Sequence, residues 1–245
     1  MFFVLHLCNV ILTGLLWLPL SLLLAYAING LADGWPHWAR PTWRPPAGAS
    51  PRSARWLRPW LTALVMAVGL PLLWLDAGWT PRFGLQSLYL AASSLIVVLD
   101  VERLRIPNLI IYPLLLVAVM AAAAGLGPRG ANGGTSSLTA ALLGGAVSLI
   151  IFGLLFAGGA WLAARLRSDT GPGLGMGDVK LAVWVGLVTG YPRVIEALFA
   201  ALIAAGLVAA LVTGVQIVRR RYRPGQPLPY GPFLVMGALW VFLRS

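Results

Sequence analysis

Long apolar runs alternate along the chain with short segments that are polar or rich in glycine and proline. Most of these runs approach the roughly 20 apolar residues that a membrane-spanning helix needs. The pattern predicts an all-α polytopic membrane protein with about eight transmembrane helices. The expected spans cover residues 3–28, 59–77, 84–101, 107–126, 137–164, 179–191, 194–217 and 229–243.

The sixth run is unusual because it is short and follows a glycine-rich segment. Residues 179–191 would form a helix about 20 Å long, whereas the hydrocarbon core of a bilayer is about 30 Å thick. The preceding residues 171–177 are mostly glycine with one proline, which do not sustain a straight helix. We therefore expect one short and broken transmembrane helix at this place.

The composition excludes a soluble globular protein. Hydrophobic residues make up 59% of the 245 residues and charged residues only 10%, whereas soluble domains carry roughly 25% charged residues. In such a chain the net charge of +11 favours contact with the anionic inner face of a lipid bilayer, and we expect no nucleic-acid partner. Cys8 is the only cysteine and His6 and His37 are the only histidines, so we expect no metal centre.

The basic residues predict how the spans are oriented. If the loop 33–58 is cytoplasmic and the spans alternate, only four of the 18 Lys and Arg residues lie outside, as the positive-inside rule requires. Both termini then lie outside as well. The first run is too long for a signal peptide and follows no basic segment, so we expect an uncleaved span. The four outside residues are Arg82, Arg129, Arg193 and Arg244.

Two of the seven acidic residues are candidates for chemistry. Asp100 ends an apolar run, and Asp178 opens the short sixth helix directly after Gly175-Met176-Gly177. Acidic residues at or within a span are costly and usually functional, although each one alone also fits an interfacial charge or a helix cap. We expect four other acids to be solvated charges in loops or at span ends: Asp33, Asp76, Asp169 and Glu196.

A pair formed by Asp100 and Asp178 would have a definite chemistry. Two carboxyl groups a few ångströms apart do not both ionise easily, so they share a proton and one acts as base while the other acts as acid. Such a pair activates water against an amide carbonyl and protonates the leaving nitrogen. Gly175 and Gly177 have no side chains, so the backbone beside Asp178 can approach another helix or a substrate closely.

Lys180 is the only lysine of the chain. It lies two residues after Asp178, and residues at i and i+2 do not share a helix face, so we do not expect a simple ion pair between them. Two interpretations remain open: an interfacial cation, or a contact with charge on a lipid or a substrate.

Three segments together resemble the type IV prepilin peptidases, which are membrane aspartic proteases with a GxGD motif. Asp100–Asn108 is similar to the first catalytic aspartate of that family with the basic turn and Ile-Pro-Asn that follow it. Gly175–Leu181 is similar to the GxGD-x-K-L motif, and Pro229–Leu234 to the Gly-Pro-Phe motif of the final span. The resemblance covers about residues 84–243, with all three motifs in order.

The resemblance implies an enzyme that removes short basic leader peptides from prepilins or pseudopilins at the cytoplasmic face of the inner membrane. It implies that Asp100 and Asp178 are the catalytic pair, that Gly175, Gly177 and Lys180 belong to the supporting motif, and that no cofactor or metal is needed. Glu102 and Asp169 are acidic residues near this site that could attract a basic leader.

The chain departs from many members of the family at its N-terminal end. Those members carry a cytoplasmic domain with two CxxC pairs, which is linked to N-methylation of the new N-terminus by S-adenosylmethionine. Here residues 1–58 comprise only a first span and a short basic loop without cysteine, so the resemblance gives no support to methyltransferase activity. We expect the peptidase domain to cover residues 59–245.

Two other functions use the same aspartates. Presenilin-like and signal-peptide-peptidase-like proteases share GxGD and would cleave other membrane peptides, but their first aspartate follows tyrosine, whereas Leu99 precedes Asp100 here. A transporter could use Asp100 and Asp178 to relay protons or cations. Transporters often show paired repeats with two broken helices, whereas this sequence shows one broken segment.

Overall fold

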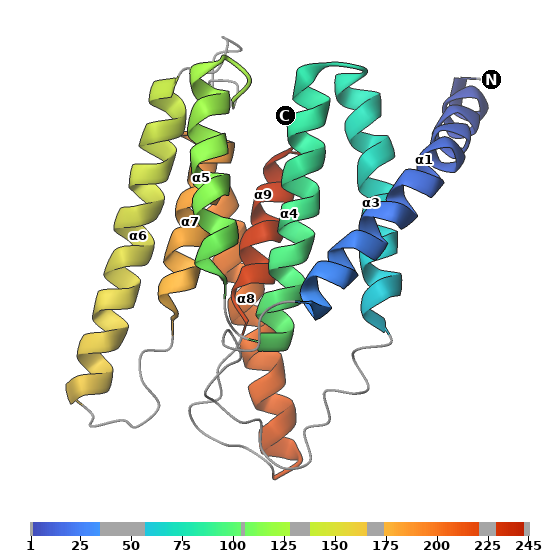
Figure 1. Cartoon of the computed structure of the whole chain (residues 1–245). Coiled ribbons are helices and arrows are strands. Elements are labelled where there is room, and N and C mark those ends of the chain that lie inside the picture. Colours follow the sequence, from blue (N-terminus) through green and yellow to red (C-terminus); the bar gives the residue numbers. More distant parts are fainter. Residues whose placement is uncertain are drawn as a thin grey trace. The chain divides into compact units, whose positions relative to one another are not determined.

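The computed structural model describes residues 2–34, 57–103, 106–127, 138–165, 174–220 and 229–242 (Figure 1). In these ranges every regular element is a helix, and each of the eight apolar runs forms one, which confirms the all-α prediction. The helices are α1 (Phe2–Asp33), α3 (Leu57–Ala77), α4 (Pro81–Arg103), α5 (Asn108–Ala123), α6 (Leu138–Arg165), α7 (Met176–Thr189), α8 (Arg193–Val218) and α9 (Gly231–Phe242).

Five of these helices are long and apolar enough to cross a membrane, which is consistent with a multi-pass membrane protein. They are α1, α3, α4, α6 and α8. The other three contain 16, 14 and 12 residues, which corresponds to lengths of about 24, 21 and 18 Å. Because these lengths fall short of the roughly 30 Å hydrocarbon core, the predicted number of eight spans is not confirmed.

The helix α5 ends earlier than its apolar run because of a glycine. The run was expected to reach residue 126, but the helix ends at Ala123 and Gly125 adopts φ +73°. The N–H of Leu126 donates to the carbonyl of Ala121 at 2.8 Å, and the N–H of Gly125 donates to that of Ala122 at 3.2 Å. This pair of bonds is the Schellman arrangement, which needs a residue that tolerates a positive φ.

The chain forms two compact units, Met1–Arg103 and Leu104–Ser245, which we name unit 1 and unit 2. Unit 1 contains α1, α3 and α4, and unit 2 contains α5 to α9. These units are defined by packing alone, so they do not test the prediction that the peptidase domain covers residues 59–245, which stays a prediction. The loop 35–56 and the segment 166–173 lie outside the described residues. Of the glycine-rich residues 171–177, where a broken backbone was expected, residues 174 and 175 precede α7 without belonging to a helix, and residues 176 and 177 belong to its first turn.

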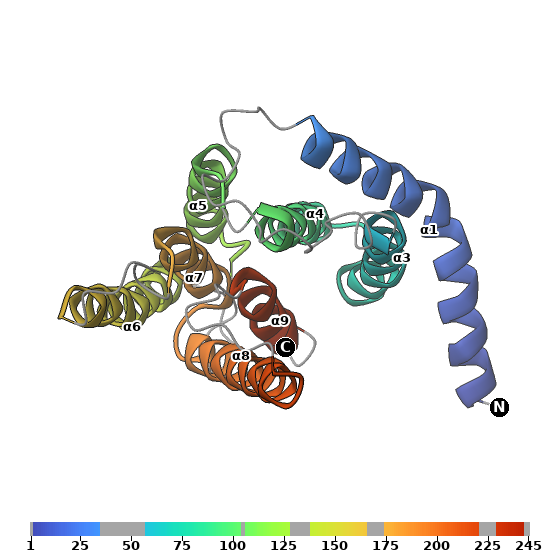
Figure 2. The ribbon, with the colours of Figure 1, turned by 90° about the horizontal axis from the view of Figure 1, so that it is seen from below.

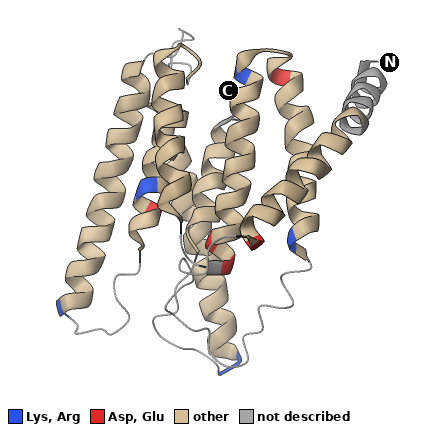
Figure 3. Ribbon diagram, viewed as in Figure 1, with Lys and Arg blue, Asp and Glu red and all other residues tan. Residues whose placement is uncertain are grey.

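In unit 1 three helix ends meet in an ionic cluster formed by Asp33, Arg58 and Glu102. Arg58 Nη2 lies 2.6 Å from Asp33 Oδ2, and Arg58 Nη1 lies 2.9 Å from Glu102 Oε1. These residues stand at the end of α1, the start of α3 and the end of α4. Figure 3 shows that the charged residues in the described part of unit 1 are concentrated near the helix ends.

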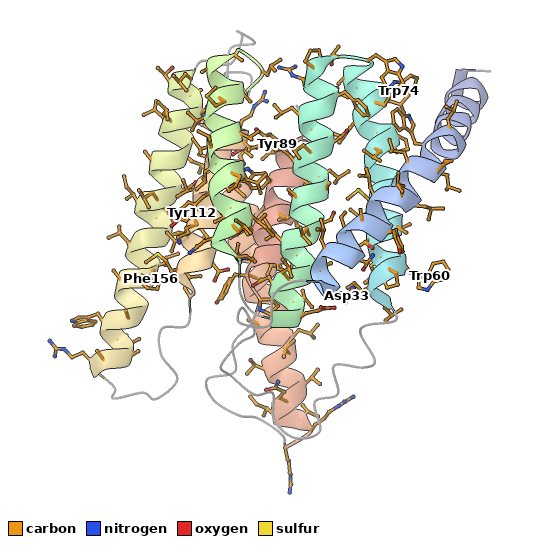
Figure 4. All side chains as sticks on the ribbon, viewed as in Figure 1. Asp33, Trp60, Trp74, Tyr89, Tyr112 and Phe156 are labelled. Carbon is orange, nitrogen blue, oxygen red and sulfur yellow. The ribbon has the colours of Figure 1, made fainter. Side chains whose placement is uncertain are left out.

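An aromatic cluster lies away from the ionic cluster of unit 1. The ring of Trp17 packs 5.1 Å from that of Phe83 and 5.4 Å from that of Trp79, and Trp74 lies 6.5 Å from Trp79. Figure 4 shows Trp74 and Asp33 at opposite ends of the unit. Along α3, Trp74 lies about 24 Å from the ionic cluster, and aromatic rings favour the interface between lipid and water.

Unit 2 is built around α7, which packs against α5, α6, α8 and α9 (Figure 2). Ten of its 14 residues are buried, so this short helix is the core of the unit. Glycines allow the close approach of α6. A Cβ atom on Gly144 would overlap the carbonyl oxygen of Gly186 and lie 2.9 Å from the Cα of Gly190. Such small residues are what membrane helices use to bring their backbones together.

We therefore expect Gly144→Ala to destabilise unit 2, because the obstructing atoms belong to the backbone and cannot rotate away. The expected loss is about 1–3 kcal/mol, seen as a lower midpoint of thermal unfolding in detergent. Gly153→Ala is the matched control on the same helix, since a Cβ at Gly153 meets nothing within 4 Å. Equal midpoints for the two variants would contradict the close packing of α6 against α7.

Candidate active site

Asp178 lies in the first turn of α7, at the end of the buried core of unit 2. The helix begins at Met176, three residues earlier than expected, with Gly175 as its N-cap in an extended conformation (φ −85°, ψ 151°). The N–H of Gly175 donates to Asp178 Oδ2 at 3.0 Å, which is one half of a capping box. A carboxylate at this place also faces the positive end of the helix dipole. The prediction that Asp178 opens the helix is confirmed.

Gly177 lets another segment of the family motif pack against this turn. A Cβ atom on Gly177 would lie 3.1 Å from Cβ and 3.6 Å from the backbone nitrogen of Ile106. Ile106 is buried and begins the Ile-Pro-Asn sequence, whose asparagine is the first residue of α5. The motif glycine therefore has a packing role in unit 2, in agreement with the expected close approach of a second segment.

Lys180 joins the same two segments through its ammonium group. Lys180 Nζ donates to Asn108 Oδ1 at 2.7 Å and lies 4.8 Å from the centre of the Tyr112 ring, which is labelled in Figure 4. Asn108 is the first residue of α5, and Tyr112 is one turn further along the same helix. The partners of this lysine are thus side chains of α5, which neither of the two sequence-based interpretations included.

Asp100 lies near the end of α4 in unit 1 and is only 4% exposed. It follows the buried residues Val98 and Leu99, as the apolar run indicated. Asp100 and Asp178 belong to different units, and each is described within its own unit. Their meeting as a carboxyl pair stays a prediction.

Burial separates these two aspartates from the other acids of the described ranges. Asp100 is 4% and Asp178 is 9% exposed, and both have polar or charged partners. The remaining four described acids are exposed as whole residues: Asp33, Asp76, Glu102 and Glu196. The predictions of solvated Asp33, Asp76 and Glu196 are therefore confirmed. Asp169 lies outside the described residues.

Glu102 was named as an acid that could attract a basic leader, which stays a prediction, and in the structure its carboxylate binds Arg58. Both of its oxygens accept hydrogen bonds from Arg58 Nη1, at 2.9 and 3.1 Å, and its side chain is 21% exposed. In the sequence Arg58 was counted only as one of the basic residues of the first loop. Its partners lie 25 and 44 residues away in the chain, so no local pattern could reveal them.

Among the described residues, no group of three His, Cys, Asp or Glu side chains could hold a metal ion.

The comparison with known families agrees with the motifs. The family described as the type IV leader peptidase family matches residues 87–210, which include Asp100 and the whole segment Gly175–Lys180. The chain belongs to this family. No curated protein and no solved structure matches the chain. Membership supports a peptidase, and the transporter alternative gains no support from it.

The contact between Lys180 and Asn108 predicts energetic coupling between α5 and α7. Because the pair is only partly covered, we expect a coupling energy of about 0.5–1 kcal/mol in a double-mutant cycle of Lys180→Met and Asn108→Ala. The measurement is the thermal unfolding midpoint of the single and double variants in detergent. Strictly additive shifts would show that the hydrogen bond contributes nothing to holding α5 against α7.

Proposed function

We propose that the protein is a membrane aspartic endopeptidase that cleaves leader peptides from type IV prepilins or pseudopilins, with Asp100 and Asp178 as its catalytic pair. The observation that carries the proposal is the selective burial of these two acids, each in a family motif, while the other described acids are exposed. Burial of a carboxyl group is costly, and perturbed buried acids are concentrated at functional sites.

The two carboxyl groups differ in their local surroundings. Asp178 accepts the N–H of Gly175 and faces the positive end of a helix dipole, a place suited to the base of the pair. Asp100 lies near the C-terminal end of α4 and would then be the acid of the pair. In the proposed reaction Asp178 takes a proton from water as it attacks the scissile carbonyl, and Asp100 donates one to the leaving nitrogen.

Chain connectivity supports the pairing of the two acids. Even a fully extended chain allows at most about 20 Å between the Cα atoms of residues 100 and 106. Ile106 packs against Gly177, which is the neighbour of Asp178. Ile106, six residues after Asp100 in the chain, therefore packs against the turn that carries Asp178, and this short separation along the sequence supports the proposed pair.

The location of the substrate follows from its chemistry. A pilin precursor joins a basic leader to an apolar helix, so the apolar part can lie along the spans while the leader remains at the cytoplasmic face of the inner membrane. The distribution of basic residues in the sequence supports a position of Asp100 and Asp178 at this same face. We propose the peptidase step alone, because the sequence contains no CxxC pair that would support methylation.

We expect Asp100→Asn and Asp178→Asn each to reduce cleavage of a co-expressed prepilin by at least about 1,000-fold, because the amide is nearly the same size but cannot transfer the proton. Cleavage is measured by mass spectrometry of the mature N-terminus, which also reports methylation. Asp76→Asn and Glu196→Gln are the matched controls, since they remove exposed acids from units 1 and 2.

Normal cleavage by either catalytic variant would refute the assignment of the pair. Loss of activity in the control variants to the same extent would mean that removal of any acid is harmful. An enzyme that cleaves signal-peptide remnants but leaves prepilins intact would be a GxGD protease for other membrane peptides. Ion uptake into proteoliposomes without peptidase activity would instead support a transporter.

The packing of Gly177 predicts a smaller effect at the motif. We expect Gly177→Ala to lower the cleavage rate about tenfold, because the added methyl group displaces Ile106 or the turn that carries Asp178. The control is Gly206→Ala on α8, where a Cβ atom meets nothing within 4 Å. An unchanged rate for Gly177→Ala, measured with the same prepilin, would rule out this role of the glycine.

A further inference from the structure

We propose that Arg58 is a positioning residue of the peptidase, which fixes the last turn of α4 and thereby Asp100. This inference rests on the proposed catalytic role of Asp100. Arg58 lies outside the region that matches the family, and it acts through Glu102 rather than by touching the reacting atoms.

The first step of the argument is the position of the ionic cluster. Arg58 is the second residue of α3, and its guanidinium bridges Asp33, the last residue of α1, and Glu102, the penultimate residue of α4. Arg58 Nη1 donates to both oxygens of Glu102, while Arg58 Nη2 donates to Asp33 Oδ2. One side chain therefore fastens the ends of all three described helices of unit 1.

The second step is the covering of the bridge. The side chain of Arg58 is 11% exposed and that of Glu102 is 21% exposed, whereas that of Asp33 is 64% exposed. An ion pair shielded from water is screened less by solvent and salt than one on the surface. The contact from Arg58 to Glu102 is thus the less solvated half of the bridge, although the contact to Asp33 is shorter, and it is the half that holds α4.

The third step is the short path from Glu102 to Asp100. The two residues are separated by one position on α4, about 3 Å along the helix axis. They lie in the final turns, where backbone carbonyls lack helical partners and helices fray. A clamp on Glu102 therefore limits fraying at the place where Asp100 must be held. A displacement of about 1 Å in a catalytic group can cost roughly 100-fold in rate.

The experiment compares Arg58→Met and Glu102→Gln in the full-length protein, purified in detergent and assayed on a prepilin. We expect kcat to fall about tenfold in both variants, with KM changed by less than about twofold, because the substrate contacts are intact and only the alignment of Asp100 is lost. Arg58→Lys keeps the charge but lacks the two guanidinium nitrogens that donate to separate carboxylates, so we expect a kcat between those of the wild type and Arg58→Met.

The matched control is Arg82→Met, which removes a cation from the opposite end of α4. We expect it to leave kcat unchanged. Hydrogen exchange of the peptide that covers the end of α4 supplies an independent readout, since Arg58→Met should speed the exchange of its amides. Glu102→Gln leaves the bond of Arg58 to Asp33 in place, so it serves as the decisive variant if Arg58→Met does not accumulate in the membrane.

An unchanged kcat in Arg58→Met, or in Glu102→Gln when that variant decides, would overturn the inference. A raised KM with normal kcat would also overturn it, because Arg58 would then contact the substrate. An equal loss in Arg82→Met would point to a general effect of charge and would overturn it too. The proposed function fails separately, if Asp100→Asn remains active. An inactive Asp100→Asn beside a fully active Arg58→Met would refute the positioning role alone.

Discussion

The cost of enclosing a carboxyl group among apolar helices governs the arrangement of this protein. An acid removed from water is tolerated only where hydrogen bonds or opposite charge replace the lost solvation. The chain has seven acids, and the two buried ones in the described ranges occur next to helix ends. At Asp178 the compensation is visible: the N-cap N–H of Gly175 and the start of a helix supply positive charge to the carboxylate.

Much of the helical fold could be predicted because it depends on local sequence. Apolar runs long enough for a helix identified each of the eight helices in the described ranges, and the buried acids were found because charge is rare in such runs. The ends were less predictable. Hydropathy carries no information on the positive φ of Gly125, so the predicted helix was longer than α5 is. Likewise, Gly177 counted as a helix breaker although it lies inside the first turn of α7.

The partners of the charged residues could not be predicted because they are distant in sequence. Lys180 binds Asn108 from 72 residues away, and Arg58 binds Glu102 from 44 residues away. Both contacts depend on which helices become neighbours, and hydropathy carries no information about that. These contacts give the family segments a physical meaning. The segments Asp100–Asn108 and Gly175–Leu181 touch each other, Ile106 against Gly177 and Asn108 against Lys180.

The enclosure of α7 by four other helices has a consequence for the biogenesis of the protein. A 14-residue helix that carries Asp178 and Lys180 is too short and too polar to partition from the translocon into lipid by itself. Two of the helices that surround it, α8 and α9, are synthesised later. The nascent α7 must therefore be sheltered by α5 and α6 until translation is nearly finished, so the core of unit 2 is complete only when α9 has emerged.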